Sequence, residues 1–183
     1  MSDKKIGIFY GSSTGQTEMV AEKLQQLLGE ENADLINVDG ATKNDLEKYS
    51  YLILGTPTWG IGEMQDDWED FSETLEKTDL KEKKVALFGL GDQDTYPDSF
   101  ADGIGILYNK IKDKTKVVGK WHKNGYLFNE SEAFRDNAFV GLVLDQENQA
   151  DKTTERLEKW VEILKKEFTW LIWHTRQRAE DLG

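Results

Sequence analysis

Short apolar runs alternate with amphipathic stretches along this chain, and that alternation constrains the fold more than any other feature. Strand-length runs lie at residues 6–10, 51–56 and 84–89. They contain few polar residues, as parallel strands buried on both faces do. The stretch after the first run places Val20 and Leu24 on one helical face. The pattern predicts an α/β fold in which helices cover both faces of one parallel sheet.

The first half of the chain supplies a further strand and two helices. We expect a second strand at Asp34–Asp39, then a brief helix capped by Thr42 and Asp45. A long loop is predicted over 57–65, before a helix that turns Trp68 inward.

The second half supplies two helices and a divided strand. One helix is predicted to be capped by Ser99 and Asp102, and the closing helix to begin near Asp151. A fifth strand begins at Lys116–Gly119 and resumes at Phe139–Leu144, so an insertion splits it.

Composition excludes several classes of function. The chain has 183 residues, 38% of them hydrophobic, which fits one globular domain. It contains no cysteine, so disulfides, thiolate metal sites and cysteine redox chemistry are excluded. The formal net charge of −12 argues against nucleic acid and is compatible with a basic protein partner, although acidity that serves solubility alone is as common. No apolar run is long enough for a membrane span or a secretory signal, so we expect a cytoplasmic protein.

A loop of glycine and hydroxyl residues joins the first strand to the first helix. The sequence reads Gly11-Ser-Ser-Thr-Gly-Gln-Thr17 and contains no lysine or arginine. At a helix N-terminus such a loop offers free N–H groups, hydroxyls and the positive end of the helix dipole, which suits a phosphate. The lysine of a nucleotide-hydrolase loop and the glycine spacing of a dinucleotide site are both missing. An ordinary strand-to-helix turn is the alternative.

Two aromatic residues follow later strands at the edge where this loop is expected. In an open α/β sheet, ligands bind beyond the carboxyl ends of the strands at the point where strand order reverses. Trp59 follows the third strand and Tyr96 the fourth, so both are predicted at that edge. Either ring alone could be a loop anchor packed on the core. Together with the phosphate loop they favour a slot for a flat ring with a phosphate tail, which FMN fits.

Three motifs in this order resemble the flavodoxin family, and its long-chain cyanobacterial and algal members in particular. The motifs are Ser12-Ser-Thr-Gly-Gln-Thr17, Pro57-Thr-Trp-Gly-Ile-Gly62 and Gly91-Asp-Gln…Tyr96. The resemblance implies a flavodoxin-like three-layer αβα sandwich, with a five-stranded parallel sheet of order 2-1-3-4-5 and an insertion splitting the fifth strand. It also implies one FMN-binding domain over 1–168 and non-covalent FMN as the cofactor.

The same resemblance implies a role for each matching residue. The phosphate would be held by Ser12, Ser13, Thr14, Gly15, Gln16 and Thr17, with Thr58 nearby. Trp59 and Tyr96 would flank the ring, Gly60 would face its N5 atom, and Asp92 would lie at its pyrimidine end. Asp145 or Glu147 would approach the ribityl chain. We see no catalytic constellation and no metal cluster.

The implied function is that of a low-potential one-electron carrier, a monomer and not an enzyme. Its partners would be basic redox proteins resembling ferredoxin-NADP reductase, photosystem I, nitrogenase or pyruvate oxidoreductase. An FMN-dependent NAD(P)H or quinone reductase on the same fold is the alternative, and a non-redox module that binds another phosphorylated ligand also remains open. Residues 169–183 run past the end of the family pattern, either as a cloning or read-through remnant or as a contact segment.

Overall fold

The computed structural model describes residues 5–168, whose strands and helices alternate along the chain. The strands of the main sheet are β1 (Ile6–Tyr10), β2 (Ala33–Asn37), β3 (Tyr51–Thr56), β6 (Lys84–Leu90), β7 (Lys116–Val118) and β10 (Leu142–Leu144). The helices are α1 (Gln16–Leu28), α2 (Lys43–Glu47), α3 (Asp66–Lys77), α4 (Asp102–Ile111) and α5 (Thr153–Glu167), with the 3-10 turn η1 (Ala150–Lys152) before α5. Two short antiparallel hairpins complete the fold, β4 (Thr58–Trp59) with β5 (Glu63–Met64) and β8 (Phe134–Arg135) with β9 (Ala138–Phe139).

The main sheet is parallel throughout, in the order β2-β1-β3-β6-β10. This is the predicted order 2-1-3-4-5, which is therefore confirmed. The predicted division of the fifth strand is confirmed too, since β7 and β10 both pair with β6, but the strand resumes at Leu142 rather than at Phe139, which belongs to the β8–β9 hairpin. Val118 lies opposite Ala86 and Leu142 opposite Phe88, so the two pieces follow one another along the same edge of β6.

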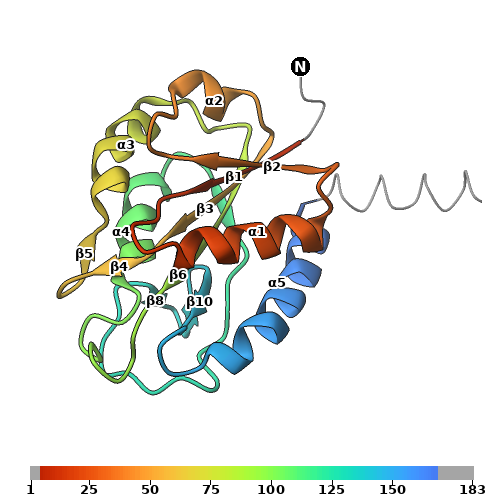
Figure 1. Cartoon of the computed structure of the whole chain (residues 1–183). Coiled ribbons are helices and arrows are strands. Elements are labelled where there is room, and N and C mark those ends of the chain that lie inside the picture. Colours follow the sequence, from red (N-terminus) through yellow and green to blue (C-terminus); the bar gives the residue numbers. More distant parts are fainter. Residues whose placement is uncertain (1–4, 169–183) are drawn as a thin grey trace, which may run out of the picture.

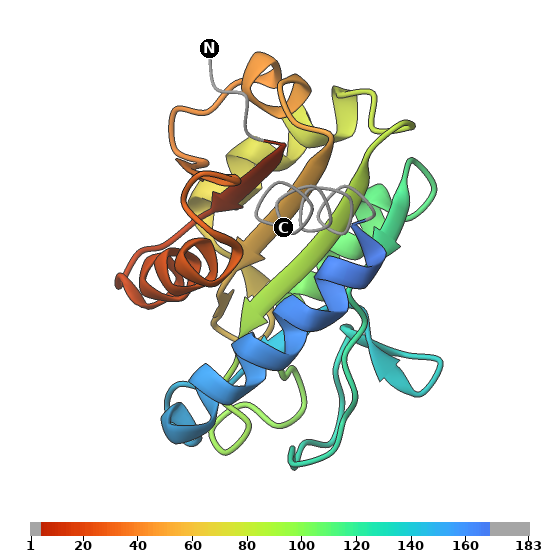
Figure 2. The ribbon, with the colours of Figure 1, turned by 90° about the vertical axis from the view of Figure 1, so that its right-hand side faces the viewer.

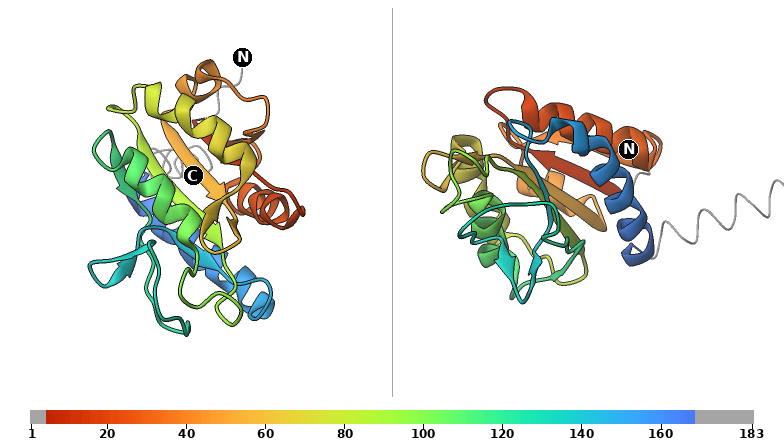
Figure 3. Two further views of the ribbon diagram at one scale, coloured as in Figure 1. Left: turned by 90° about the vertical axis from the view of Figure 1, so that its left-hand side faces the viewer. Right: turned by 90° about the horizontal axis from the view of Figure 1, so that it is seen from below.

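The helices form a layer on each side of the sheet (Figure 1). Helices α1 and α5 lie along one face, as Figure 2 shows, and α3 and α4 cover the other, as Figure 3 shows. The insertion, coloured cyan, projects at the edge of the sheet formed by β7 and β10 (Figure 2). Within residues 5–168, no helix combines the length and the apolar character needed to cross a lipid bilayer.

Two buried tryptophans anchor one helix to each face of the sheet. Trp68 of α3 and Trp160 of α5 are fully buried, as their helical spacing predicts. Their indole N–H groups donate to Gly55 O and Gly119 O, both at 2.8 Å. Because buried polar groups are costly without a partner, these bonds fix how each helix sits on the sheet.

The structure corrects two predictions about helix and loop boundaries. The segment 57–65, predicted as a loop, contains the β4–β5 hairpin. Helix α4 begins at Asp102 after Ala101, and the structure gives no side-chain cap from Ser99, so that predicted cap is wrong. The cap predicted for α2 is confirmed, since Asp45 Oδ2 accepts hydrogen bonds from Thr42 N and Thr42 Oγ1.

The extension predicted at 169–183 lies outside the described residues.

Within residues 5–168, the buried apolar side chains form one core cluster.

Candidate functional site

The loop between β1 and α1 places an open helix N-terminus at the carboxyl edge of the sheet. Gly15 precedes α1 in the left-handed conformation, with φ of +89°. No side chain caps the helix, and Gly15 N donates to Ser12 Oγ at 3.0 Å. The N–H groups of the first turn of α1 have no partner within the helix. Ser13 and Thr14 are exposed beside them, so the loop presents donors that a phosphate can use.

A buried glutamine holds this loop against the next helix. Gln65 is almost fully buried and donates from Nε2 to Ser13 Oγ at 3.1 Å. Its Oε1 accepts a hydrogen bond from Trp68 N at the start of α3. The loop therefore rests on a rigid element, as a preformed binding site does.

Two aromatic side chains lie on loops at the same carboxyl edge of the sheet. Trp59 on β4 is 43% exposed and Tyr96, in the loop after β6, is 42% exposed. Burial of large apolar rings is normally favourable, so two half-exposed rings on neighbouring loops mark a surface available to a ligand.

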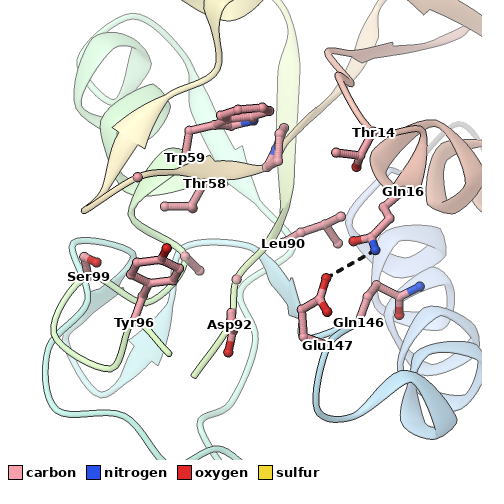
Figure 4. Close-up of a pocket in the computed structure, with 14 residues that line it drawn as sticks. Thr14, Gln16, Thr58, Trp59, Leu90, Asp92, Tyr96, Ser99, Gln146 and Glu147 are labelled. Carbon is pink, nitrogen blue, oxygen red and sulfur yellow. Dashed lines mark hydrogen bonds between the residues drawn. The ribbon is translucent and has the colours of Figure 1, made fainter. Parts of the chain in front are cut away.

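The phosphate loop, the aromatic loops and the loop after β10 surround one cavity of about 240 Å³ (Figure 4). The predicted site residues that line it are Thr14, Gln16, Thr58, Trp59, Gly60, Asp92, Tyr96 and Glu147. The other lining residues, for which the sequence predicted no role, are Pro57, Leu90, Gly91, Ser99, Ala101 and Gln146, and of these Pro57 and Gly91 begin two of the sequence motifs. No lysine or arginine is among the residues of this lining.

Some of the missed residues carried a usable signal and others did not. Leu90 ends β6, so the rule for the carboxyl ends of strands could have identified it, and Gly91, which follows it, begins the third sequence motif. Ser99 and Ala101 gave no such signal, because their stretch resembles a helix start.

Five predicted residues lie outside the cavity lining: Ser12, Ser13, Gly15, Thr17 and Asp145. The first four belong to the phosphate loop and the start of α1, where Thr17 is buried. Asp145 is fully buried, and its carboxylate accepts hydrogen bonds from Gln93 N at 3.1 Å and Asn148 N at 3.0 Å. The structure thus places Asp145 as an anchor beneath two loops and Glu147 on the cavity wall.

A hydrogen bond crosses the cavity wall between distant parts of the chain. Gln16 Nε2, at the start of α1, donates to Glu147 Oε1 at 3.3 Å (Figure 4). The bond joins the phosphate loop to the loop after β10, so the two loops meet at one end of the cavity.

Asp92 brings a negative charge to the cavity lining. Burial alone would raise the pKa of this carboxyl, but hydrogen bonds from Thr95 N and Asn148 Nδ2 outweigh it and lower the pKa below its ordinary value. Asp92 is therefore ionised at neutral pH.

The arrangement defines a class of protein: a doubly wound α/β protein with a cofactor pocket at the point where strand order reverses. The pocket combines two available aromatic faces with a phosphate-binding loop. Its residues fit a planar ring that carries a phosphate on a flexible chain.

Comparison with known proteins makes the assignment specific. The family model for flavodoxin matches residues 8–160. A flavodoxin of Nostoc sp. is 50% identical over 166 residues, covering 90% of this chain and 98% of the relative. A flavodoxin of Helicobacter pylori is 47% identical over 164 residues, with the same coverage of 90% and 98%. The crystal structure of a Fusobacterium nucleatum flavodoxin bound to flavin mononucleotide superposes with a TM-score of 0.85, at 36% identity, over 90% of this chain and 98% of that one.

The chain belongs to the flavodoxin family. Members of this family are FMN-dependent electron carriers, and their partners are other redox proteins. The predicted family, fold and class of function are therefore confirmed, and the chain is an electron-transfer protein rather than an enzyme.

Proposed function

We propose that this chain binds FMN non-covalently in the described cavity and carries single electrons between larger redox proteins. The observation that carries the proposal is the pair of half-exposed rings, Trp59 and Tyr96, in one cavity with the β1–α1 loop. FMN supplies the electron chemistry when it is bound. The protein binds it, shields it from water and sets the charge around it.

The β1–α1 loop would hold the phosphate. The residues proposed for this are Ser12, Ser13, Thr14, Gly15, Gln16 and Thr17, with Thr58 beside them. Thr58 Oγ1 accepts a hydrogen bond from Gly103 N at 3.0 Å, which fixes β4 at the cavity wall. Backbone N–H groups and hydroxyls would bind the dianion, since the lining holds no basic side chain.

The two aromatic loops would hold the ring. Trp59 and Tyr96 would lie against its faces, Asp92 near one end, and Glu147 beside the flexible chain. Gly60, at the tip of the β4–β5 hairpin, has φ of +49°, and a Cβ there would lie 3.2 Å from the Glu63 carboxyl carbon. A glycine leaves this backbone free to change its peptide orientation toward the ring.

Acidic side chains on these loops and at the start of α3 would make extra negative charge in the pocket unfavourable. They are Glu63, Asp66, Asp67, Asp92, Asp94 and Asp98. Since like charges repel and the pocket wall has a low dielectric, the second electron would enter at a low potential. We therefore propose a low-potential carrier.

Binding of flavins to the apoprotein tests the proposal directly. Riboflavin has the same ring and ribityl chain as FMN but lacks the phosphate. Two hydrogen bonds to a charged phosphate contribute about 1.5–3 kcal/mol each, so FMN should bind about a hundredfold tighter or more. Equal affinities, measured by quenching of flavin fluorescence, would show that the β1–α1 loop does not bind the phosphate.

Stepwise anaerobic reduction separates the carrier from the reductase alternative. We expect the visible spectrum to pass through a distinct one-electron form and the protein not to oxidise NADH or NADPH catalytically. Direct two-electron bleaching together with NAD(P)H turnover would favour the reductase.

The proposed partners are basic redox proteins, because the chain carries a net charge of −12 and acidic residues surround the cavity. Association with a basic haem protein should weaken as ionic strength rises, since salt screens exposed charges. Glu63→Lys on the hairpin should weaken it more than Asp113→Lys, which makes the same charge change beyond the end of α4. Equal effects of the two variants would argue against docking at the cavity mouth.

Four further expectations stay proposals: a single domain over 1–168, an extension at 169–183 that does not belong to this domain, a monomeric state and a cytoplasmic location. The single core cluster and the family match over 8–160 support the first of these. Partner affinity with and without 169–183 tests the second, sedimentation tests the oligomeric state and cell fractionation tests the location.

A further inference from the structure

A buried carboxylate lies behind the cavity at a point where three segments meet. Asp102, the first residue of α4, has only 8% of its surface exposed. It follows Ala101, which lines the cavity in a left-handed conformation with φ of 55°. Asp102 itself does not line the cavity. Its influence on the pocket must therefore act through its neighbours.

One oxygen of Asp102 faces the hairpin that carries Trp59. A Cβ built on Gly62 would lie 2.6 Å from Asp102 Oδ2 and 3.1 Å from Ser99 Cβ. Gly62 has φ of +89°, so both space and backbone conformation require glycine there. The turn that ends the Trp59–Gly62 segment thus packs directly on this carboxylate.

The other oxygen holds the insertion. Asp102 Oδ1 accepts a hydrogen bond from Glu132 N at 2.8 Å. The following residue, Gly103, donates its N–H to Thr58 Oγ1 on β4. The first turn of α4 therefore connects the hairpin of the cavity to the insertion through two adjacent residues.

The charges around Asp102 do not compensate its own. Two acidic side chains of the insertion, Glu130 and Glu132, add negative charge near it. Three basic side chains of the insertion and of α4 have other contacts: Arg135 donates to Glu132 O and covers the Tyr108 ring, Lys123 covers Phe134, and Lys110 pairs with Glu76. Among residues 5–168, no lysine or arginine forms an ion pair with Asp102.

We propose that Asp102 is a positioning residue whose ionisation is coupled to the conformation of the Gly60–Gly62 turn and to the charge of the group bound in the cavity. Loss of a proton from Asp102 leaves a negative charge buried against Gly62, and the turn must adjust to it. By linkage, added negative charge in the cavity favours the protonated carboxyl. Burial, with Glu132 and Glu130 adding to it, raises the pKa of Asp102 above its ordinary value of 3.8, although the Glu132 N–H opposes the shift. The second half of this proposal rests on the proposed binding of FMN.

The apoprotein provides the first test. A pH titration by NMR would follow the Asp102 side-chain carbon and the Gly62 amide together. We expect one common midpoint above 3.8, with the Gly62 titration lost in Asp102→Asn and kept in Asp113→Asn. A Gly62 amide that is insensitive to pH across the Asp102 titration would overturn the proposal. The wild-type titration alone decides this point if Asp102→Asn does not fold.

The FMN-loaded protein provides the second test. Asp102→Asn should raise the midpoint potential of the lower-potential step and reduce its dependence on pH, while Asp113→Asn should change neither as strongly. Equal potentials in the two variants would overturn the coupling to the cavity. If no FMN binds, the proposed function fails, yet the apoprotein titration still decides whether Asp102 and Gly62 are linked.

Discussion

At the scale of the residue, two glycines in the left-handed conformation allow the effect of a substitution on stability to be distinguished from its effect on ligand binding. Gly15 in the phosphate loop and Gly40 after β2 have φ of +89° and +82°. A Cβ on either would meet no atom within 4 Å among the described residues, so only the backbone conformation disfavours a side chain. The two positions differ in one respect, their place relative to the cavity.

Alanine at these two positions should therefore have equal effects on stability and unequal effects on binding. Each substitution should lower the free energy of unfolding by about 1–2 kcal/mol, the cost of a left-handed L-residue. Gly15→Ala should also weaken FMN binding by about tenfold, since displacing one N–H donor from a charged phosphate costs about 1.5–3 kcal/mol. Urea unfolding and flavin titration measure the two effects. Weakened binding in Gly40→Ala as well would assign the loss to general destabilisation.

The exposed ring of Trp59 gives a second prediction at this scale. Trp59→Ala should weaken FMN binding by about 2 kcal/mol, or roughly thirtyfold, because a ligand ring would lose its aromatic face and the burial that goes with it. Ile61 is the matched control on the same hairpin, since it is 83% exposed and does not line the cavity. Ile61→Ala should leave FMN affinity nearly unchanged. A comparable loss there would mean that the whole hairpin tip, rather than the indole, determines affinity.

At the scale of the element, local rules succeed where a segment meets few tertiary demands. Helix α2 has five residues, too few to be stable alone. Its capping box adds hydrogen bonds at the N-terminus that stabilise it. Thr42 and Asp45 exchange the hydrogen bonds that the sequence pattern predicts.

Thr42→Ala should lower the free energy of unfolding by about 1 kcal/mol at neutral pH. The Lys48 side chain, and next the Thr42 N–H, lower the pKa of Asp45, so its contribution is present above the ordinary value of 3.8 and is lost as the pH falls below it. The cost of Thr42→Ala should accordingly be smaller in acid, as urea unfolding at two pH values would show. Lys48→Met, which breaks only an exposed ion pair, should cost less at neutral pH.

Other elements could not be predicted from local rules, for identifiable reasons. The apolar run Tyr51–Thr56 predicts its strand to the residue, because burial on both faces leaves a clear pattern. Strands β4 and β5 have two residues each, too short for any period, and Gly60 and Gly62 read as loop signals. Ser99 resembles a helix cap, but the chain instead uses Phe100 to fill the aromatic cluster of the insertion, where it lies near Phe128 and Phe139.

In the candidate site, too, some residues could be predicted from the sequence and others could not. Motifs on loops predicted the aromatic pair and the phosphate loop, because those residue types have few other uses in that order. Asp145 and Glu147 were not distinguishable by sequence, since both acids lie in one turn after β10. Only the fold shows that Asp145 is buried under two loops while Glu147 reaches the wall.

At the scale of the whole molecule, three tyrosines link proton binding to stability in alkaline solution. Burial is the main cause that raises the pKa of Tyr10, Tyr49 and Tyr126, and in Tyr126 it raises the value to about 12 despite nearby Arg156. Neighbouring acids, Glu18 for Tyr10 and Asp34 for Tyr49, add to the shift.

The folded state therefore keeps these protons at pH values where the unfolded chain, with an ordinary value near 10.0, has lost them. The resulting stability is fully present below pH 10 and is lost as the pH rises toward 12. Urea unfolding at pH 9, 10 and 11 should show the decline, and Tyr126→Phe should reduce its slope. A free energy of unfolding that does not fall above pH 10 would contradict this account.

The split of the fifth strand has a consequence for how the sheet accommodates the insertion. Strands β7 and β10 occupy successive positions along β6, and only Leu87 separates the residues they pair with, Ala86 and Phe88. The chain leaves the sheet after β7 and returns as β10 almost directly beyond it along β6. The interruption therefore removes few of the hydrogen bonds that pair the fifth strand with β6. The entropy of closing an excursion grows only with the logarithm of its length. The sheet can therefore accommodate a long excursion at this edge with little loss of strand pairing, and here the excursion is tied back to the cavity loops by the hydrogen bonds of Glu132 N to Asp102 and of Leu127 N to Gln93.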